Sequence, residues 1–207
     1  PGGGGGGGGG GSCGGGGGCF IAGTLITMAD GTSKPIEQLR AGDAVLSWNP
    51  GRGEALSATV SRTWSGRRGS VYRINDRVSA TWSHPFWTRE AGWASVNPDA
   101  TLKDHGWKPA QLAVGRHLLS AGGEWMAVEN IDQLPGEHEV FNLVDIGPQQ
   151  SYFAGGILAH NKDGVGACCY LGGEGICHDL PESECIGSAW EYLGEETTCG
   201  EMQYCEF

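Results

Sequence analysis

Between Gly23 and Tyr152 the chain is a succession of short apolar and β-branched runs, among them TLITM, AVLSW, SATVSRTW, SVYRI and EVFNLVDI. Glycine, proline, asparagine and aspartate separate these runs, which is the usual punctuation of turns between strands. Runs of this length and alternation are typical of half-buried strands. The sequence therefore predicts an all-β fold.

A weak internal repeat lies within this β-rich stretch. Gln38 to Ser47 reads QLRAGDAVLS and Gln111 to Ser120 reads QLAVGRHLLS, and the two segments match at Gln, Leu, Gly, Leu and Ser. Internal similarity at this level indicates that one structural unit occurs twice. We expect a duplicated β unit.

Length and charge exclude several classes of protein. A chain of 207 residues has room for one full domain and a small extra module. No apolar run approaches the roughly 18 residues that span a membrane. Basic residues are dispersed and the net charge is −11, which disfavours a nucleic-acid partner. The chain begins at Pro1 without a charged and then apolar leader, so we expect a fragment or processed piece and leave its localisation open.

Composition divides the chain into three segments. Residues 1–18 hold 15 glycines and no charged side chain, which predicts a flexible linker. Residues 19–161 hold the β-rich stretch. Residues 162–207 hold ten acidic residues, one basic residue and six of the eight cysteines, which predicts a separate acidic cysteine-rich module. These six are Cys168, Cys169, Cys177, Cys185, Cys199 and Cys205.

The cysteine-rich segment is too short and too polar for an independent core, so covalent or metal links have to stabilise it. Six cysteines form an even disulfide set with 15 alternative pairings, which favours an exported or cell-surface location. Zinc is the alternative. The segment lacks a C-x-x-C pair, and its adjacent Cys168 and Cys169 fit a tetrahedral site poorly, so we favour disulfides. An interaction or spacer role fits this segment.

Two reactive groups lie at the ends of the β-rich stretch. As a thiolate, Cys19 can attack the carbonyl of Gly18 and convert that amide to a thioester. At the other end, the side-chain amide of Asn161 can attack its own carbonyl and release the chain that starts at Lys162. Neither step needs a cofactor or a metal. The pair predicts backbone cleavage at both ends of the stretch.

Three motifs resemble those of a Hint (hedgehog/intein) domain of the bacterial intein-like type. They are CFIAGTLITMADGTSKPIEQLRAGDAVLSWN from Cys19, TWSHPFWT with Thr81 and His84, and VFNLVDIGPQQSYFAGGILAHN ending at Asn161. Their order and separation make the resemblance specific. It implies a β horseshoe of pseudo-twofold related units that brings both ends into one cleft. It also implies single-turnover autocatalytic self-processing that acts in cis on the flanking protein segments.

The resemblance assigns roles to individual residues. Thr81 and His84 are expected to hold the Gly18–Cys19 peptide, with His84 protonating the departing amine and Thr81 orienting the amide. His160 is expected to donate to the carbonyl oxygen of Asn161 as negative charge develops there.

Departures from the family pattern favour cleavage over splicing. Lys162 stands where a splicing intein has Cys, Ser or Thr to accept the N-side segment. Gln150 stands where a histidine often assists the C-terminal step, and Gln cannot transfer a proton at neutral pH. Asn142 replaces a usual acidic or thiol residue, and Asp145 is a further accessory candidate. External thiols or amines could then capture the thioester.

Several other residues carry weaker expectations. Cys13 lies six residues before Cys19 and could form a disulfide with it that blocks processing until reduced. His105, His117 and His138 fit no motif and are expected to be solvated or structural. The tryptophans are expected to serve core and strand packing rather than to form a carbohydrate platform. The alternative function is a catalytically weakened Hint scaffold with a cysteine-rich binding module.

Overall fold

The computed structural model describes residues 18–144, 146, 147, 149–161, 165–170, 177–181 and 190–195. Three of the candidate residues, Cys13, Asp145 and Lys162, lie outside the described residues. The described part consists mainly of strands, with one short 3-10 turn, η1 (Ile36–Gln38), and the helix α1 (Pro98–His105). The predicted all-β class is confirmed.

One antiparallel sheet of six strands contains the first described strand at its centre. Its order is β14-β7-β8-β1-β15-β6. The strands are β14 (Ile131–Leu134), β7 (Val71–Ile74), β8 (Val78–Thr81), β1 (Phe20–Ile21), β15 (His138–Val144) and β6 (Arg62–Arg68). Phe20 faces Ala80 of β8 on one side and Phe141 of β15 on the other. The preceding Cys19 is therefore held inside the sheet rather than at its edge.

A second sheet of nine strands contains the last strand before Asn161. Its main path is β11-β10-β9-β17-β16-β2-β3, and β12 pairs with β9 and β13. The strands are β11 (Ala110–Gln111), β10 (Gly92–Ser95), β9 (Phe86–Thr88), β17 (Ile157–His160), β16 (Ser151–Ala154), β2 (Leu25–Thr27), β3 (Ser33–Pro35), β12 (His117–Leu119) and β13 (Trp125–Ala127). Ala159 of β17 faces Phe86 of β9. Since β8 and β9 are consecutive, the turn between them connects the two sheets.

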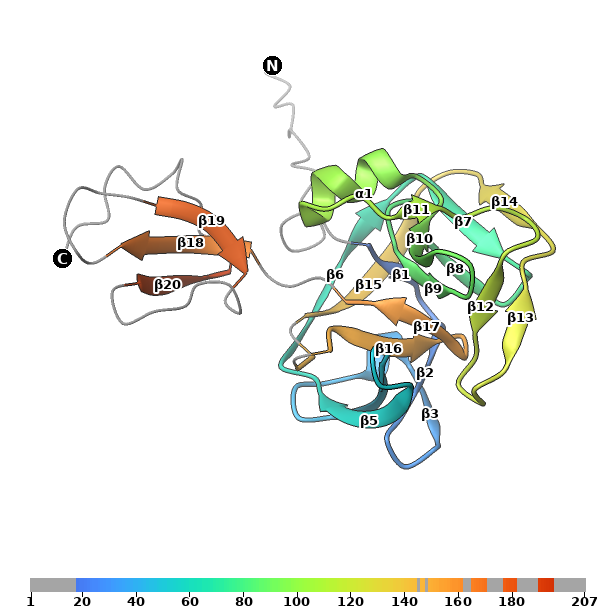
Figure 1. The fold of residues 1–207 in the computed structure, drawn as a ribbon, viewed down its shortest axis with the longest axis horizontal. Helices are drawn as coiled ribbons and strands as arrows, with labels where there is room; N and C mark the ends of the chain where they lie inside the picture. Colours follow the sequence, from blue (N-terminus) through green and yellow to red (C-terminus); the bar gives the residue numbers. More distant parts are fainter. Residues whose placement is uncertain are drawn as a thin grey trace, which may run out of the picture.

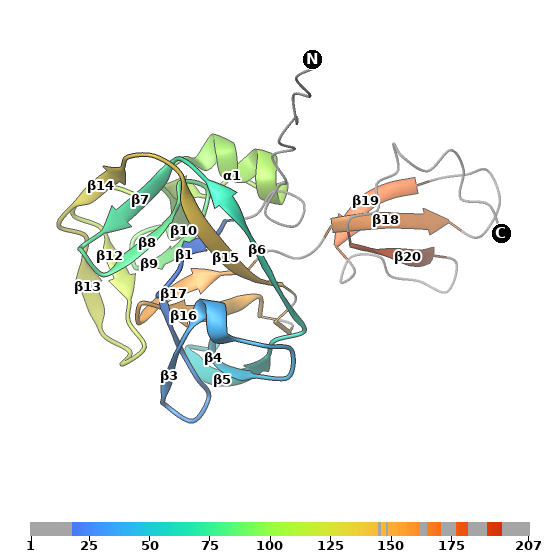
Figure 2. The ribbon, with the colours of Figure 1, turned by 180° about the vertical axis from the view of Figure 1, so that it is seen from behind.

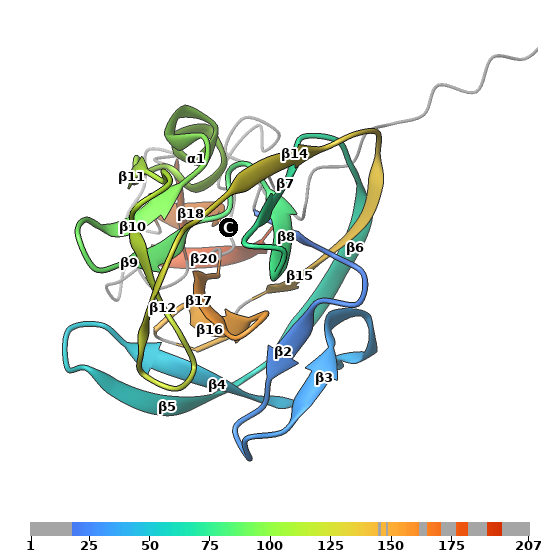
Figure 3. The ribbon, with the colours of Figure 1, turned by 90° about the vertical axis from the view of Figure 1, so that its right-hand side faces the viewer.

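Figures 1 and 2 show how these parts are arranged. The long strands β6 and β15 run side by side along one flank, and α1 lies at the end of the molecule where β1 begins. The hairpin of β4 (Ala44–Asn49) and β5 (Glu54–Thr59) lies beside β16, as the turned view in Figure 3 also shows. Ser151 of β16 fastens this hairpin, because its Oγ donates to the Trp48 carbonyl at 2.8 Å.

The core contains an aromatic cluster that packs side chains of the two sheets against each other. Phe20, Phe86 and Tyr152 come from β1, β9 and β16 and are almost completely buried. The Phe20 ring meets the other two edge to face, with centroid distances of 6.2 and 6.0 Å. Edge-to-face contacts between buried rings add to the hydrophobic stabilisation. One aromatic cluster therefore supports strands from both sheets.

The internal repeat of the sequence is a repeat in the structure. Gly42 and Gly115 occupy matching positions and have φ angles of 91° and 90°. The N–H of Gly42 donates to the Val60 carbonyl at 2.9 Å, and the N–H of Gly115 donates to the Val128 carbonyl at 2.8 Å. A hairpin follows each glycine, β4–β5 in one case and β12–β13 in the other. The expected duplicated β unit is confirmed.

The helix α1 was not predicted, although its ends carry recognisable signals. Asn97 is the N-cap, and its side chain accepts a hydrogen bond from the Ala100 N–H at 3.0 Å. Pro98 occupies the first helical turn, and Gly106 ends the helix in the left-handed conformation with φ of 77°. This combination of cap, proline and terminal glycine stabilises a short helix. Its last residue is His105.

The described part of the C-terminal segment forms a small sheet of its own. It contains β18 (Val165–Tyr170), β19 (Cys177–Pro181) and β20 (Trp190–Glu195) in the order β19-β18-β20. Both neighbours pair antiparallel with β18, and this sheet lies apart from the other strands in Figure 1. Neither helical segment in the described ranges is long and apolar enough to cross a membrane.

The matched glycines give a prediction about stability. A Cβ at Gly42 or Gly115 would meet no atom within 4 Å, so substitution there costs only the strain of the left-handed backbone. We expect Gly42→Ala and Gly115→Ala each to lower the free energy of unfolding by about 1 to 2 kcal/mol, measured by urea denaturation. Gly122→Ala is the matched control, since Gly122 lacks a positive φ and its added Cβ would be 3.8 Å from the Ser120 hydroxyl. Equal effects at all three positions would contradict this reading.

Candidate self-processing site

Thr81 makes hydrogen bonds to both the N–H and the carbonyl group of Cys19. The N–H of Cys19 donates to the Thr81 hydroxyl oxygen at 2.9 Å, and the N–H of Thr81 donates to the Cys19 carbonyl at 2.9 Å. Both side chains are buried, with exposed fractions of 0% for Cys19 and 6% for Thr81. The nitrogen of the Gly18–Cys19 peptide is therefore fixed against the end of β8.

His84 lies on the Gly18 side of the same peptide bond. A Cβ added to Gly18 would be only 2.6 Å from the His84 Cα and would also overlap the imidazole ring. The ring packs on Phe20 with a centroid distance of 4.1 Å. Only glycine fits the position before Cys19 in this arrangement, because no side chain can occupy the space that His84 fills.

The buried surroundings keep His84 neutral. Burial lowers the pKa of His84 to about 3, with a further lowering from the nearby His160 ring, and the backbone groups of Gly18 and His160 only partly oppose this. Within the described residues neither ring nitrogen makes a full hydrogen bond. At neutral pH the ring therefore carries one N–H donor and one acceptor, and Nδ1 is the nitrogen that lies against Gly18.

The turn that carries Thr81 and His84 also contacts the other end of the β-rich stretch. The N–H of His84 donates to the Thr81 carbonyl at 3.0 Å, which closes the turn. The following Pro85 accepts a hydrogen bond from the His160 N–H at 3.0 Å. One short turn thus binds the backbone of Cys19 and the backbone of His160.

Aromatic rings surround His160. Trp93 and Trp107 approach its imidazole edge to face, with centroid distances of 4.8 and 5.3 Å, and His105 lies at 6.1 Å. Burial lowers the pKa of His160 to about 4, and the backbone of Asn161 opposes this in part. The ring is accordingly neutral at physiological pH and lies half-buried against the two indoles.

Asn161 is positioned by Gln150 through two hydrogen bonds. Its side-chain Nδ2 donates to Gln150 Oε1 at 2.9 Å, and its backbone N–H donates to the Gln150 carbonyl at 2.6 Å. Gln150 has a φ of 44°, which is uncommon for a residue with a side chain. This strained conformation directs both groups of Gln150 to the same asparagine, which is completely buried.

The side chain of Asn142 is hydrogen-bonded to a tyrosine. The Tyr152 hydroxyl donates to Asn142 Oδ1 at 3.2 Å in the buried core. Burial raises the pKa of Tyr152, so this hydroxyl stays protonated. The Asn142–Tyr152 pair therefore offers no group that titrates near neutral pH.

Cys19 is disulfide-bonded in the structure and is not a free thiol. Cys13, its partner in the sequence-based hypothesis, lies outside the described residues. The attack on Gly18 requires a thiolate, so reduction has to precede it.

Sequence reasoning missed the part that three residues have in this site. His105 was expected to be solvated or structural, but its Nε2 accepts a hydrogen bond from the Gly18 N–H at 3.4 Å. Trp93 and Trp107 were expected to serve core and strand packing, and they also contact the ring of His160. The signals of α1, Asn97-Pro98 and Gly106, could have placed His105 at a helix end, although not beside Gly18.

The remaining histidines and tryptophans have ordinary positions. His117 is paired with Glu90 at 2.7 Å near the surface, and the His138 ring lies 3.1 Å from the Pro135 carbonyl. Both agree with the expectation of surface or structural histidines. Trp82 and Trp125 are 38% and 39% exposed, so neither is a core residue, while Trp125 lies on strand β13.

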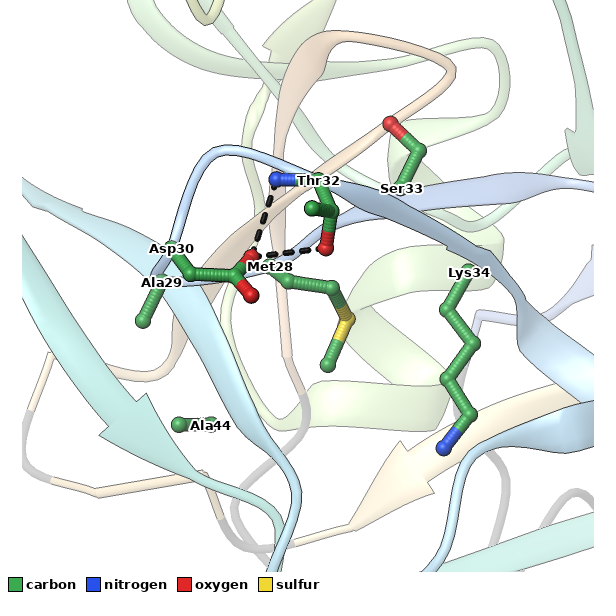
Figure 4. Close-up of a pocket in the computed structure, with 7 residues that line it drawn as sticks. All are labelled: Met28, Ala29, Asp30, Thr32, Ser33, Lys34 and Ala44. Atoms are coloured by element: carbon green, nitrogen blue, oxygen red, sulfur yellow. Dashed lines mark hydrogen bonds between the residues drawn. The ribbon is translucent and has the colours of Figure 1, made fainter.

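A separate hollow lies under the β2–β3 hairpin. Its wall contains Asp30, whose Oδ1 accepts hydrogen bonds from the Thr32 N–H and hydroxyl at 2.9 and 2.6 Å, as Figure 4 shows. These bonds lower the pKa of the Asp30 carboxyl. They stabilise the hairpin turn, and none of the residues lining this hollow belongs to the candidate site.

Comparison with known proteins gives one family match. The AXH family, described as the Ataxin-1 and HBP1 module, matches residues 20–123, about half of the chain. The match begins after Cys19 and ends before β16 and β17, so it includes neither end of the β-rich stretch. No curated protein matches the chain.

Solved structures match the fold over most of the chain. The bacterial intein-like domain from Clostridium thermocellum is 27% identical, with a TM-score of 0.56, covering 69% of this chain and 98% of that domain. A DnaB intein from Synechocystis sp. PCC 6803 is 25% identical, with a TM-score of 0.54 and coverages of 70% and 99%. The TvoVMA intein, at 18% identity and a TM-score of 0.55, covers 70% of this chain and 99% of its own and shares the fold.

The two buried histidines predict how stability depends on pH. The folded pKa values of about 3 and 4 lie below the ordinary histidine value near 6.5. As the pH falls below 6.5, the unfolded chain binds protons that the folded chain does not. We expect the free energy of unfolding to fall between pH 7 and pH 5, by up to about 1.4 kcal/mol per pH unit for each histidine. Urea denaturation at several pH values measures this slope, and a flat profile would contradict the assignment.

Proposed function

The chain belongs to the AXH family by its match over residues 20–123, and it carries a Hint domain of the intein-like type. From the Hint domain we propose that the chain cleaves its own backbone at Gly18–Cys19 and at Asn161–Lys162. The observation that carries the proposal is the hydrogen bond from the Cys19 N–H to the Thr81 hydroxyl, next to the neutral His84. Each cleavage happens once per molecule, so the chain is autocatalytic rather than a turnover enzyme.

The proposed organisation follows from the cleavage points. Residues 1–18 are the linker on the N-side, residues 19–161 are the self-processing domain, and residues 162–207 are the segment on the C-side. The structural likeness to intein-like domains covers 69% of the chain, which is consistent with a domain of this length. The substrates are therefore the flanking protein segments in cis.

At the N-side, Cys19 Sγ attacks the carbonyl carbon of Gly18. The C–N bond to Cys19 breaks, a thioester forms between Gly18 and Sγ, and one proton passes overall from sulfur to nitrogen. Thr81 holds the nitrogen that departs. His84, whose Nδ1 lies against Gly18, is proposed to take the thiol proton and deliver it to that nitrogen. Such positioning contributes strongly when a group has to reach a single reacting atom.

At the C-side, the Asn161 Nδ2 attacks the Asn161 backbone carbonyl carbon. A succinimide forms, the bond to Lys162 breaks, and the Lys162 amine leaves with a proton. Gln150 supports this step because its Oε1 accepts a hydrogen bond from Nδ2 and fixes the amide nitrogen at 2.9 Å. His160, neutral and sheltered by Trp93 and Trp107, is the donor proposed for the developing negative charge.

Cleavage without ligation is the proposed outcome. Lys162 offers neither a hydroxyl nor a thiol to accept the N-side segment from the thioester. The Asn142–Tyr152 pair supplies no proton relay near neutral pH, which favours two independent steps. The thioester is then open to water or to external thiols and amines, and an amine would join the N-side segment to another molecule.

A redox gate is part of the proposal. Because Cys19 is disulfide-bonded in the structure, a dithiol reductant has to supply two electrons before the thiolate can form. Cys13 is the proposed partner, since it lies six residues before Cys19 on the glycine-rich linker. Processing would begin only where the chain meets a reducing environment.

The C-terminal segment is proposed as an exported, disulfide-stabilised interaction or spacer module. Support comes from the small sheet of β18 to β20, in which Cys168 and Cys169 are completely buried and disulfide-bonded. This segment also defines the competing function, a Hint scaffold with weakened chemistry that presents a cysteine-rich binding module.

Intact mass spectrometry of the chain placed between two reporter domains tests the function. With reductant, we expect one fragment that ends at Gly18 and another that begins at Lys162. Cys19→Ala should abolish only the first fragment, and Asn161→Ala only the second. Without reductant, the parent should lose N-side cleavage, and Cys13→Ala should retain it.

Each other outcome is informative. A joined product of Gly18 and Lys162 would show splicing instead of cleavage. A reduced parent that stays whole would favour the scaffold. If Cys13→Ala and the parent responded identically to reductant, the redox gate would be removed from the proposal while cleavage remained.

A further inference from the structure

The C-terminal end of α1 contacts the residue whose carbonyl is attacked in the proposed reaction. His105 Nε2 accepts a hydrogen bond from the Gly18 N–H at 3.4 Å, across 87 positions of the sequence. His105 belongs to none of the three motifs that carry the resemblance. The contact is on the opposite side of Gly18 from the scissile bond, so it acts on the N-side segment and not on Cys19 itself.

A second contact fixes the same face of α1 to the turn beside Cys19. Thr101, four residues before His105, donates through its hydroxyl to the Ser83 carbonyl at 2.8 Å and lies 2.6 Å from the Ser95 hydroxyl. Residues four apart share one face of a helix. Thr101 therefore binds the turn that carries His84, and His105 extends from that face to Gly18.

Gly18 needs an external restraint more than another residue would. The overlap between a Cβ and His84 limits this position to glycine, and glycine is the residue with the most backbone freedom. Thr81 fixes only the Cys19 side of the peptide. A hydrogen bond to the Gly18 N–H restricts the remaining rotation, which sets the direction in which the Gly18 carbonyl faces the Cys19 sulfur.

We propose that His105 is a positioning residue for the N-side step, holding the Gly18 N–H so that the Gly18 carbonyl presents itself to Cys19. This inference rests on the proposed function. The ring has to accept at Nε2, so it acts as the tautomer with its proton on Nδ1. His105 also lies 6.1 Å from His160, but its hydrogen bond is to the N-side segment, so the C-side step should not depend on it.

The test compares three substitutions of His105 in the chain flanked by two reporter domains, in reductant. The rates of fragment formation at Gly18 and at Lys162 are followed separately by intact mass spectrometry. We expect His105→Ala to slow N-side cleavage about tenfold, the effect of one lost hydrogen bond. His105→Gln should restore most of the rate, because its Oε1 reaches the place of Nε2. His105→Asn is the matched control, since its shorter amide reaches only the place of Nδ1.

The outcomes separate this inference from the proposed function. C-side cleavage should stay within about twofold of the parent in all three variants, which a general folding defect would not allow. A parent that cleaves while His105→Ala cleaves at the same N-side rate would overturn the role of His105 and leave the function intact. If the Gln and Asn variants both showed equally slowed cleavage at the N-side and the C-side, His105 would have a structural role instead of a positioning role. A parent that cleaves at neither end would overturn both.

Discussion

The pair of hydrogen bonds between Thr81 and Cys19 is the interaction on which the site depends. It fixes both polar groups of the Cys19 backbone, so the Gly18–Cys19 peptide has one orientation relative to the turn that follows β8. The same turn places His84 beside Gly18 and presents the Pro85 carbonyl to His160. Two points 141 positions apart in the sequence, Cys19 and His160, are thus positioned by the five consecutive residues 81–85.

Burial gives this small site its electrostatic character. His84 is fully buried and His160 is partly buried, and the neutral forms of both are favoured because burial makes the charged forms unfavourable. Hydrogen bonds made away from water are stronger than those in water, which applies in part to the two that Asn161 donates to the partly buried Gln150. The site acts by holding neutral donors and acceptors at fixed positions.

The sequence predicted the residues with chemistry and the general fold, because both are local signals. Short β runs, the glycines of the repeat, Cys19 and the His160-Asn161 pair can each be recognised within a few residues. The position of β1 between β8 and β15 could not be predicted, since it depends on pairing between strands distant in sequence. The same reason explains why His105 was missed: nothing near it indicates that it meets Gly18.

Gln150 shows the remaining limit of sequence reasoning. Its replacement of a histidine indicated a loss of proton transfer, and the amide cannot titrate. Its left-handed backbone, however, was not visible in the sequence, and that conformation directs two hydrogen bonds to Asn161. The replacement of histidine by Gln150 thus removes proton transfer but keeps hydrogen bonding to Asn161, and only the geometry shows the second contribution.

The most direct test of the account is a comparison of Thr81→Ser with Thr81→Val in the reduced chain between two reporter domains. Val keeps the shape of Thr without its hydroxyl, and Ser keeps the hydroxyl. We predict that the Ser variant forms the fragment ending at Gly18 about tenfold faster than the Val variant, with similar C-side cleavage in both. Equal N-side rates in the two variants would contradict it, because the hold of Thr81 on the Cys19 amide would then be irrelevant to cleavage.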